Sequence, residues 1–77
     1  MMKKIKSSVL STGNDNFVKV EIKGNRDKML YAFYINGKSI AIGFLSEIKA
    51  MYDSWFNASE EQRDFALNNN SIIGVKK

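Results

Sequence analysis

The chain has 77 residues, of which 44% are hydrophobic and 26% charged, and its net charge is +4 at neutral pH. A chain of this length buries only about 60 to 65% of the surface that its unfolded form exposes, so we expect one small soluble domain with a modest core. The sequence contains no cysteine, histidine or proline. Its composition excludes a Ser-His-Asp or Cys-His triad, a thiol redox site and a Cys/His zinc site. We therefore expect a protein that is not an enzyme and has no cofactor and no metal site.

Positive charge is concentrated in the first part of the chain. Residues 1–44 contain eight Lys or Arg and three acidic residues, whereas residues 45–77 contain four and five. Such a distribution favours nucleic acid or an acidic protein surface as a partner, and it is also typical of a small domain that stays in solution. No apolar run indicates a signal peptide or a membrane span, so we expect a cytoplasmic protein without a membrane partner.

Alternating apolar and polar residues predict four strands, over residues 4–10, 17–23, 28–35 and 38–44. Asn36-Gly37 separates the last two and favours a two-residue type I′ turn, because both central positions of that turn need positive φ. Residues 71–75 are apolar enough to add a fifth strand at a sheet edge.

After residue 45 the apolar residues recur at steps of three and four, which predicts two helices. The first covers residues 46–57, is capped by Ser46 and directs a set of apolar side chains to the core: Ile48, Met51, Tyr52, Trp55 and Phe56. Ser59-Glu60-Glu61-Gln62 has the pattern of a capping box and opens the second helix, over residues 59–68. Phe65 and Ala66 are its candidates for the core.

Loop lengths predict which strand residues face one another. A turn at Asn36-Gly37 places Phe33 opposite Ile40, a four-residue turn over 24–27 places Ile22 opposite Met29, and a six-residue loop over 11–16 places Val9 opposite Val18. All three pairings collect the apolar side chains on one face. The expected apolar face contains Ile5, Val9, Val18, Val20, Ile22, Met29, Tyr31, Phe33, Ile35, Ile40, Ile42 and Phe44. We therefore predict a two-layer α+β fold, in which two helices pack on one face of a four-stranded antiparallel meander.

The opposite face of this sheet is left uncovered and is the leading candidate for a binding surface. Its expected members are Lys4, Lys6, Ser8, Leu10, Phe17, Lys19, Glu21, Lys23, Leu30, Ala32, Tyr34, Ser39, Ala41 and Gly43. In this register Phe17 and Tyr34 are direct cross-strand neighbours beside Lys19. We select six partner-binding residues: Lys6, Phe17, Lys19, Glu21, Tyr34 and Ser39. An open face with a cross-strand aromatic pair also has a purely structural interpretation, since antiparallel sheets often keep one solvated face.

Three kinds of partner fit such a face. The first is a host protein or nucleoprotein complex, with the aromatic side chains as buried anchors. The second is nucleic acid, because basic and aromatic residues together can bind phosphates and stack on bases. The third is a second copy of the chain, so that the protein is either a monomer or a homodimer.

Several short motifs in the middle third of the chain are similar to those of a known group of proteins. The hairpin Asn36-Gly37-Lys38-Ser39, the following Phe44, and Ser54-Trp55-Phe56 in the first helix, together with the order of strands before two helices, resemble a group of small phage-encoded anti-CRISPR proteins that inhibit type I-F surveillance complexes. The resemblance implies a phage-encoded, non-enzymatic inhibitor that docks on a multi-protein, RNA-guided complex of the host. No contact residue of that family is carried over to this sequence.

Overall fold

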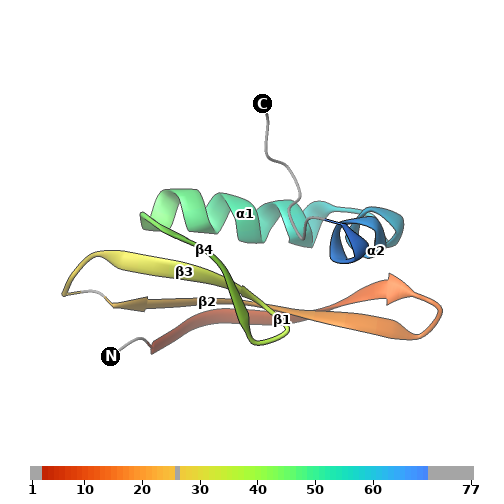
Figure 1. The fold of residues 1–77 in the computed structure, drawn as a ribbon, viewed down its shortest axis with the longest axis horizontal. Coiled ribbons are helices and arrows are strands. Elements are labelled where there is room, and N and C mark those ends of the chain that lie inside the picture. The colour runs from red at the N-terminus through yellow and green to blue at the C-terminus, as the bar shows by residue number, and fades with distance from the viewer. Residues whose placement is uncertain (1–2, 26, 70–77) are drawn as a thin grey trace.

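Four strands precede two helices in the computed structural model, which describes residues 3–25 and 27–69 (Figure 1). The elements are β1 (Lys3–Gly13), β2 (Asn16–Asn25), β3 (Leu30–Ile35), β4 (Lys38–Gly43), α1 (Leu45–Asn57) and α2 (Glu60–Asn68). The strands form one antiparallel sheet in the order β1-β2-β3-β4. This arrangement confirms the predicted α+β fold and its meander. The fifth strand expected over 71–75 lies outside the described residues.

Both helices lie on the same side of the sheet (Figure 1). Helix α1 packs on β2, β3 and β4, whereas α2 packs on β1. The protein therefore has the two layers that the sequence predicts, and in the described part of the chain no helix lies on the other face of the sheet. None of the helices in the described ranges is both long enough and apolar enough to cross a membrane.

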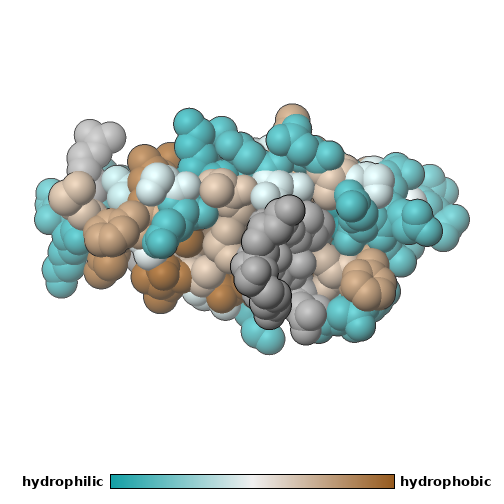
Figure 2. Space-filling view, turned by 90° about the horizontal axis from the view of Figure 1, so that it is seen from above, coloured by the Kyte–Doolittle hydropathy of each residue, from teal (hydrophilic) through white to brown (hydrophobic). Residues whose placement is uncertain are grey.

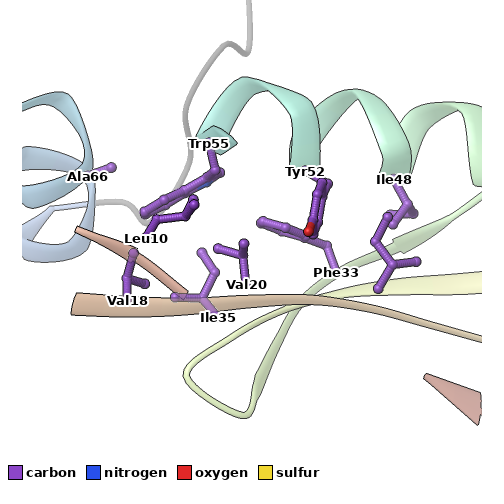
Figure 3. Packing of buried hydrophobic residues seen from close by; sticks show 10 residues of the cluster. Leu10, Val18, Val20, Phe33, Ile35, Ile48, Tyr52, Trp55 and Ala66 are labelled. Carbon is purple, nitrogen blue, oxygen red and sulfur yellow. The ribbon is translucent and has the colours of Figure 1, made fainter. Parts of the chain in front are cut away.

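The core lies between α1 and the sheet. Trp55, Tyr52 and Ile48 point from α1 toward apolar side chains of the strands (Figure 3). The largest fully buried side chains are those of Trp55, Phe33, Ile22, Ile48, Val18 and Val20. Burial of one large apolar side chain contributes about 1.5 to 3 kcal/mol, so this small cluster supplies much of the free energy that orders the chain.

The helix starts follow from short-range hydrogen bonds. Ser59 and Gln62 form the predicted capping box at α2, in which the Ser59 Oγ accepts from the Gln62 amide and the Gln62 Oε1 accepts from the Ser59 amide, each at 3.1 Å. Helix α1 begins one residue earlier than predicted, because β4 runs directly into it and Phe44, rather than Ser46, is the N-cap. The Phe44 amide donates to the Glu47 carboxylate at 3.4 Å.

Over residues 6–11, the two faces of β1 are exchanged relative to the prediction. Its connection to β2 is a two-residue turn at Asn14-Asp15, both with positive φ, and β1 extends to Gly13, so the predicted six-residue loop is wrong. Leu10 pairs with Val18 and Ser8 with Val20, a shift of one residue from the predicted register. A shift of one residue reverses the strand. Leu10 is accordingly in the core, and Ile5 and Val9 are exposed.

The pairing of β2 with β3 is shifted by four residues from the prediction. Ile22 lies opposite Phe33, and Val20 lies opposite Ile35. An even shift leaves every side chain on its predicted face. The core-facing residues of β2 and β3 are therefore on the expected side, but their cross-strand neighbours differ, and Tyr34 lies opposite Glu21 instead of Phe17. Met29, predicted opposite Ile22, lies in the turn before β3 and is exposed, so its predicted place on the apolar face is wrong.

The β3–β4 hairpin begins as predicted and then changes register. Asn36 and Gly37 have φ values of 51° and 84°, and Ile35 pairs with Lys38, which confirms the turn. A β-bulge follows, because Ser39 pairs with Tyr34 whereas Ala41 pairs with Phe33. The extra residue, Ile40, reverses the rest of the strand.

The bulge changes the faces predicted for the end of β4. Ala41 and Gly43 share the helix side with their partners Phe33 and Tyr31, whereas Ile42, paired with Ala32, is exposed on the opposite face. Phe44 is also exposed and does not join the core. The predicted positions of these four β4 and linker residues, Ala41, Ile42, Gly43 and Phe44, are therefore wrong.

Two phenylalanines that the helical spacing assigned to the core are exposed. Phe56 follows the buried Trp55 in α1, and Phe65 precedes the buried Ala66 in α2. Successive helix residues point about 100° apart, so a narrow contact with the sheet buries only one of each pair.

Candidate partner-binding face

The sheet face opposite the helices, called the open face below, is defined by the strand pairing. Paired residues share a face and alternate along each strand. The open face includes Lys4, Ser7, Val9 and Ser11 in β1; Phe17, Lys19, Glu21, Lys23 and Asn25 in β2; Leu30, Ala32 and Tyr34 in β3; and Ser39 and Ile42 in β4.

A buried carboxylate lies at the centre of the open face. Glu21 is 4% exposed, and its Oε2 is 3.7 Å from the Lys4 Nζ and 3.9 Å from the Lys19 Nζ. Its neighbours in the adjacent strands are Ser7 and Tyr34. The two lysines are 53% and 48% exposed at their side chains, so each ion pair contributes at most about 1 kcal/mol to stability. Their effect is mainly to hold two ammonium groups over one carboxylate.

A third lysine is held by an aromatic ring. The Lys23 Nζ lies 4.5 Å from the centroid of the Tyr34 ring, a cation–π contact between diagonal neighbours of β2 and β3. The ring and the ammonium thus cover each other in part. Together with Lys4 and Lys19, Lys23 gives the centre of the open face three positioned cationic groups.

Exposed apolar side chains occupy both ends of the open face. Val9 and Phe17 are diagonal neighbours near the β1–β2 turn, and Leu30 and Ile42 are diagonal neighbours at the other end. Phe17 and Leu30, the outer members of the two pairs, are separated by about eight residues of β2, or about 26 Å at the rise of an extended strand, whereas Val9 and Ile42 are about four residues apart along it. The open face therefore has an apolar group at each end and positive charge between them.

Five of the six residues selected from the sequence lie on the open face: Phe17, Lys19, Glu21, Tyr34 and Ser39. The predicted contact between Phe17 and Tyr34 is wrong, because Tyr34 pairs with Glu21, four residues further along β2. Lys6 is on the helix side, since it pairs with Ile22 and its Nζ lies 4.9 Å from the centroid of the Tyr52 ring. The positions expected for Ser8 and Leu10 on the open face are wrong for the same reason.

Two members of the apolar ends, Val9 and Ile42, were assigned to the core from the sequence. The run Gly13-Asn14-Asp15 indicates the tight turn, because its residue types all tolerate positive φ, but that turn alone would pair Val9 with Val20 on the core side. Bulges at Thr12 and Ile40 bring Val9 and Ile42 to the open face, and neither bulge residue is a glycine or a proline that would mark it in the sequence.

The helix side differs from the open face. Seen from above, it is hydrophilic along much of α1 and α2, and apolar side chains gather at the end where α1 begins (Figure 2). The exposed fraction of Phe65 in α2 is 68%, close to the 62% of Phe17. It therefore provides a matched control for the open face.

In comparisons with known proteins, no protein-family model, no curated protein and no solved structure matches the chain. Among the described residues, no group of three or more acidic side chains is placed to hold a metal ion.

Proposed function

We propose that the chain is a small non-enzymatic inhibitor that docks on a host protein or defence complex through the open face. The observation that carries this proposal is the pair of exposed apolar ends on a sheet face that no described helix covers. Grouped apolar side chains with polar residues beside them are typical of interaction surfaces, and large apolar and aromatic side chains dominate the energetics of protein interfaces. The fixed charges between the ends would align the partner.

The specific form of the proposal is a phage-encoded inhibitor of a type I-F surveillance complex in the host cytoplasm. It is supported by the resemblance in the hairpin Asn36-Gly37-Lys38-Ser39 and in Ser54-Trp55-Phe56. These motifs lie in the β3–β4 hairpin and in α1, where the Asn36-Gly37 turn shapes the sheet and Trp55 lies in the core. They would thus preserve the scaffold, and the open face would make the contact.

Capture from bacterial lysate tests the general proposal. Tagged wild-type protein, Phe17→Ser and Phe65→Ser are incubated with lysate that has or has not been treated with nuclease, and the retained proteins are identified by mass spectrometry. We expect a discrete set that survives nuclease, is lost with Phe17→Ser and is kept with Phe65→Ser. Retention that vanishes with nuclease would instead favour the nucleic-acid alternative, and equal retention by both variants would place the interface elsewhere.

A plaque assay tests the specific form. A bacterial strain with a type I-F system expresses the protein or one of the two variants and is infected with a phage that the system targets. We expect wild type and Phe65→Ser to restore plaques and Phe17→Ser to fail. If folded wild-type protein restores none, this target is wrong even where the lysate experiment finds another partner.

A further inference from the structure

The central side chains of the open face present positive charge to a partner. The Glu21 side chain is 6% exposed, whereas those of Lys4 and Lys19 are about half exposed. An approaching surface therefore meets ammonium groups, while the carboxylate stays beneath them and keeps them in place. Lys23, held against the Tyr34 ring, adds a third cation to the same row.

This charge argues against a second copy of the chain as the partner. Two open faces brought together would place lysines against lysines, and like charges opposed in an interface cost free energy. Pairing through the sheet edges is also hindered, because β1 and β4 each carry a β-bulge and begin with lysine. Lysines and bulges at edges are features that prevent strand addition.

The side chains also favour protein over nucleic acid. Base stacking needs free aromatic rings. On the open face the Tyr34 ring is already covered in part by the Lys23 ammonium, which leaves Phe17 as the exposed aromatic side chain there. The other exposed apolar groups, Val9, Leu30 and Ile42, are aliphatic and suit an apolar protein surface.

We infer that the open face recognises a protein surface that carries carboxylates at its centre and apolar side chains at both ends. The inference rests on the proposed function and adds the chemistry of the partner. Lys4, Lys19 and Lys23 pair with the carboxylates, and the two apolar ends, whose outer residues Phe17 and Leu30 are about 26 Å apart, bury aliphatic or aromatic groups. Because Glu21 already holds two of the lysine side chains in place, less side-chain conformational entropy is lost when the partner binds.

Defined peptides test this inference without knowledge of the natural partner. Two synthetic amphipathic peptides of about 16 residues, long enough to cover most of the open face as a helix, share their leucine positions and carry either glutamate or glutamine at every polar position. A single-stranded oligothymidylate of similar length is the third probe. Each is titrated into the ¹⁵N-labelled protein, and backbone amide shifts report the affinity and the binding site.

The protein variants are matched in net charge. Lys19→Gln/Lys23→Gln removes two charges from the open face, and Lys38→Gln/Lys49→Gln removes two exposed charges from the start of β4 and from α1. We expect the glutamate peptide to shift amides of β2 and to lose about ten-fold in affinity with the first variant and less than about two-fold with the second. The glutamine peptide should bind at least about five-fold more weakly than the glutamate peptide.

Several results would overturn the inference: equal binding of the two peptides, equal losses in the two double variants, no binding of the glutamate peptide to the open face, or tighter binding of oligothymidylate there. The lysate experiment separates these failures from failure of the proposed function. Proteins that are lost with Phe17→Ser but fully retained by Lys19→Gln/Lys23→Gln would leave the docking function standing and refute the acidic partner.

Discussion

The side-chain hydroxyl of Ser8 in β1 forms a hydrogen bond with the hydroxyl of Tyr52 in α1. The contact joins the sheet to the helix layer at a position where neither residue is fully exposed. Two residues earlier, the Lys6 ammonium lies over the ring of the same tyrosine. Tyr52 thus gathers two polar side chains of β1 on the helix side, which leaves Ser7 and Val9 for the open face.

A double-mutant cycle at this pair tests the face assigned to β1. Tyr52→Phe and Ser8→Ala should each cost about 0.5 to 1.5 kcal/mol of unfolding free energy, because each removes a partly buried hydrogen bond. The double variant should cost about 1 kcal/mol less than the sum of the two. Urea denaturation measures all four proteins. Additive losses would mean that the two hydroxyls do not interact and that Ser8 lies on the other face.

The fold was predictable because its main signals are local and redundant. Alternation in β2, the Asn36-Gly37 turn and the Ser59 capping box each depend on residues close together in the chain, and each is found in the structure. The register of β2 with β3 was missed by four residues, yet the faces were right, since an even shift preserves them.

The composition of the open face was harder to predict, because one extra residue in a strand exchanges its faces. The bulge at Thr12, beside the Asn14-Asp15 turn, reversed the middle of β1, and the bulge at Ile40 reversed the end of β4. Residues of the two central strands were therefore placed correctly, whereas Lys6, Val9 and Ile42 at the sheet edges were not. Edge strands have one neighbour each, so fewer contacts constrain their register.

A substitution at Gly24 tests the pairing of β2 with β3. Gly24 lies opposite Tyr31, and a Cβ added to it would be 2.2 Å from the Tyr31 Cδ2. Gly24→Ala must displace this ring and should cost about 1 to 3 kcal/mol. In a Tyr31→Ala background the same substitution should cost less than about 0.5 kcal/mol. Chemical denaturation of the four proteins gives both values, and an equal cost in the two backgrounds would contradict the observed register.

The guanidinium of Arg63 joins three parts of the chain, so its geometry should matter more than its charge. Its nitrogens donate to the carbonyls of Trp55 at 2.9 Å, Ser11 at 2.8 Å and Phe56 at 3.0 Å. The bonds satisfy carbonyls at the end of α1 and tie α2 to β1.

Arg63→Lys keeps the positive charge but cannot make three directed bonds, so we expect a loss of about 2 to 4 kcal/mol in unfolding free energy. Lys49→Ala, at an exposed position of α1, is the control and should change stability by less than about 0.5 kcal/mol. Equal stabilities of Arg63→Lys and wild type in urea would show that one hydrogen bond or the charge alone is sufficient.

Trp55 and Phe56 are adjacent in α1 but differ in burial, with exposed fractions of 1% and 54%. Trp55→Ala should cost about 3 to 5 kcal/mol, because it opens a cavity beside Leu10 and Val18. Phe56→Ala should cost less than about 1 kcal/mol, because its ring is largely in solvent. Since a domain of this size has little stability to lose, Trp55→Phe, with an expected loss of about 1 to 2 kcal/mol, keeps the comparison measurable if Trp55→Ala does not fold. Similar losses for Trp55→Phe and Phe56→Ala, in urea denaturation followed by circular dichroism, would contradict the orientation of α1 on the sheet.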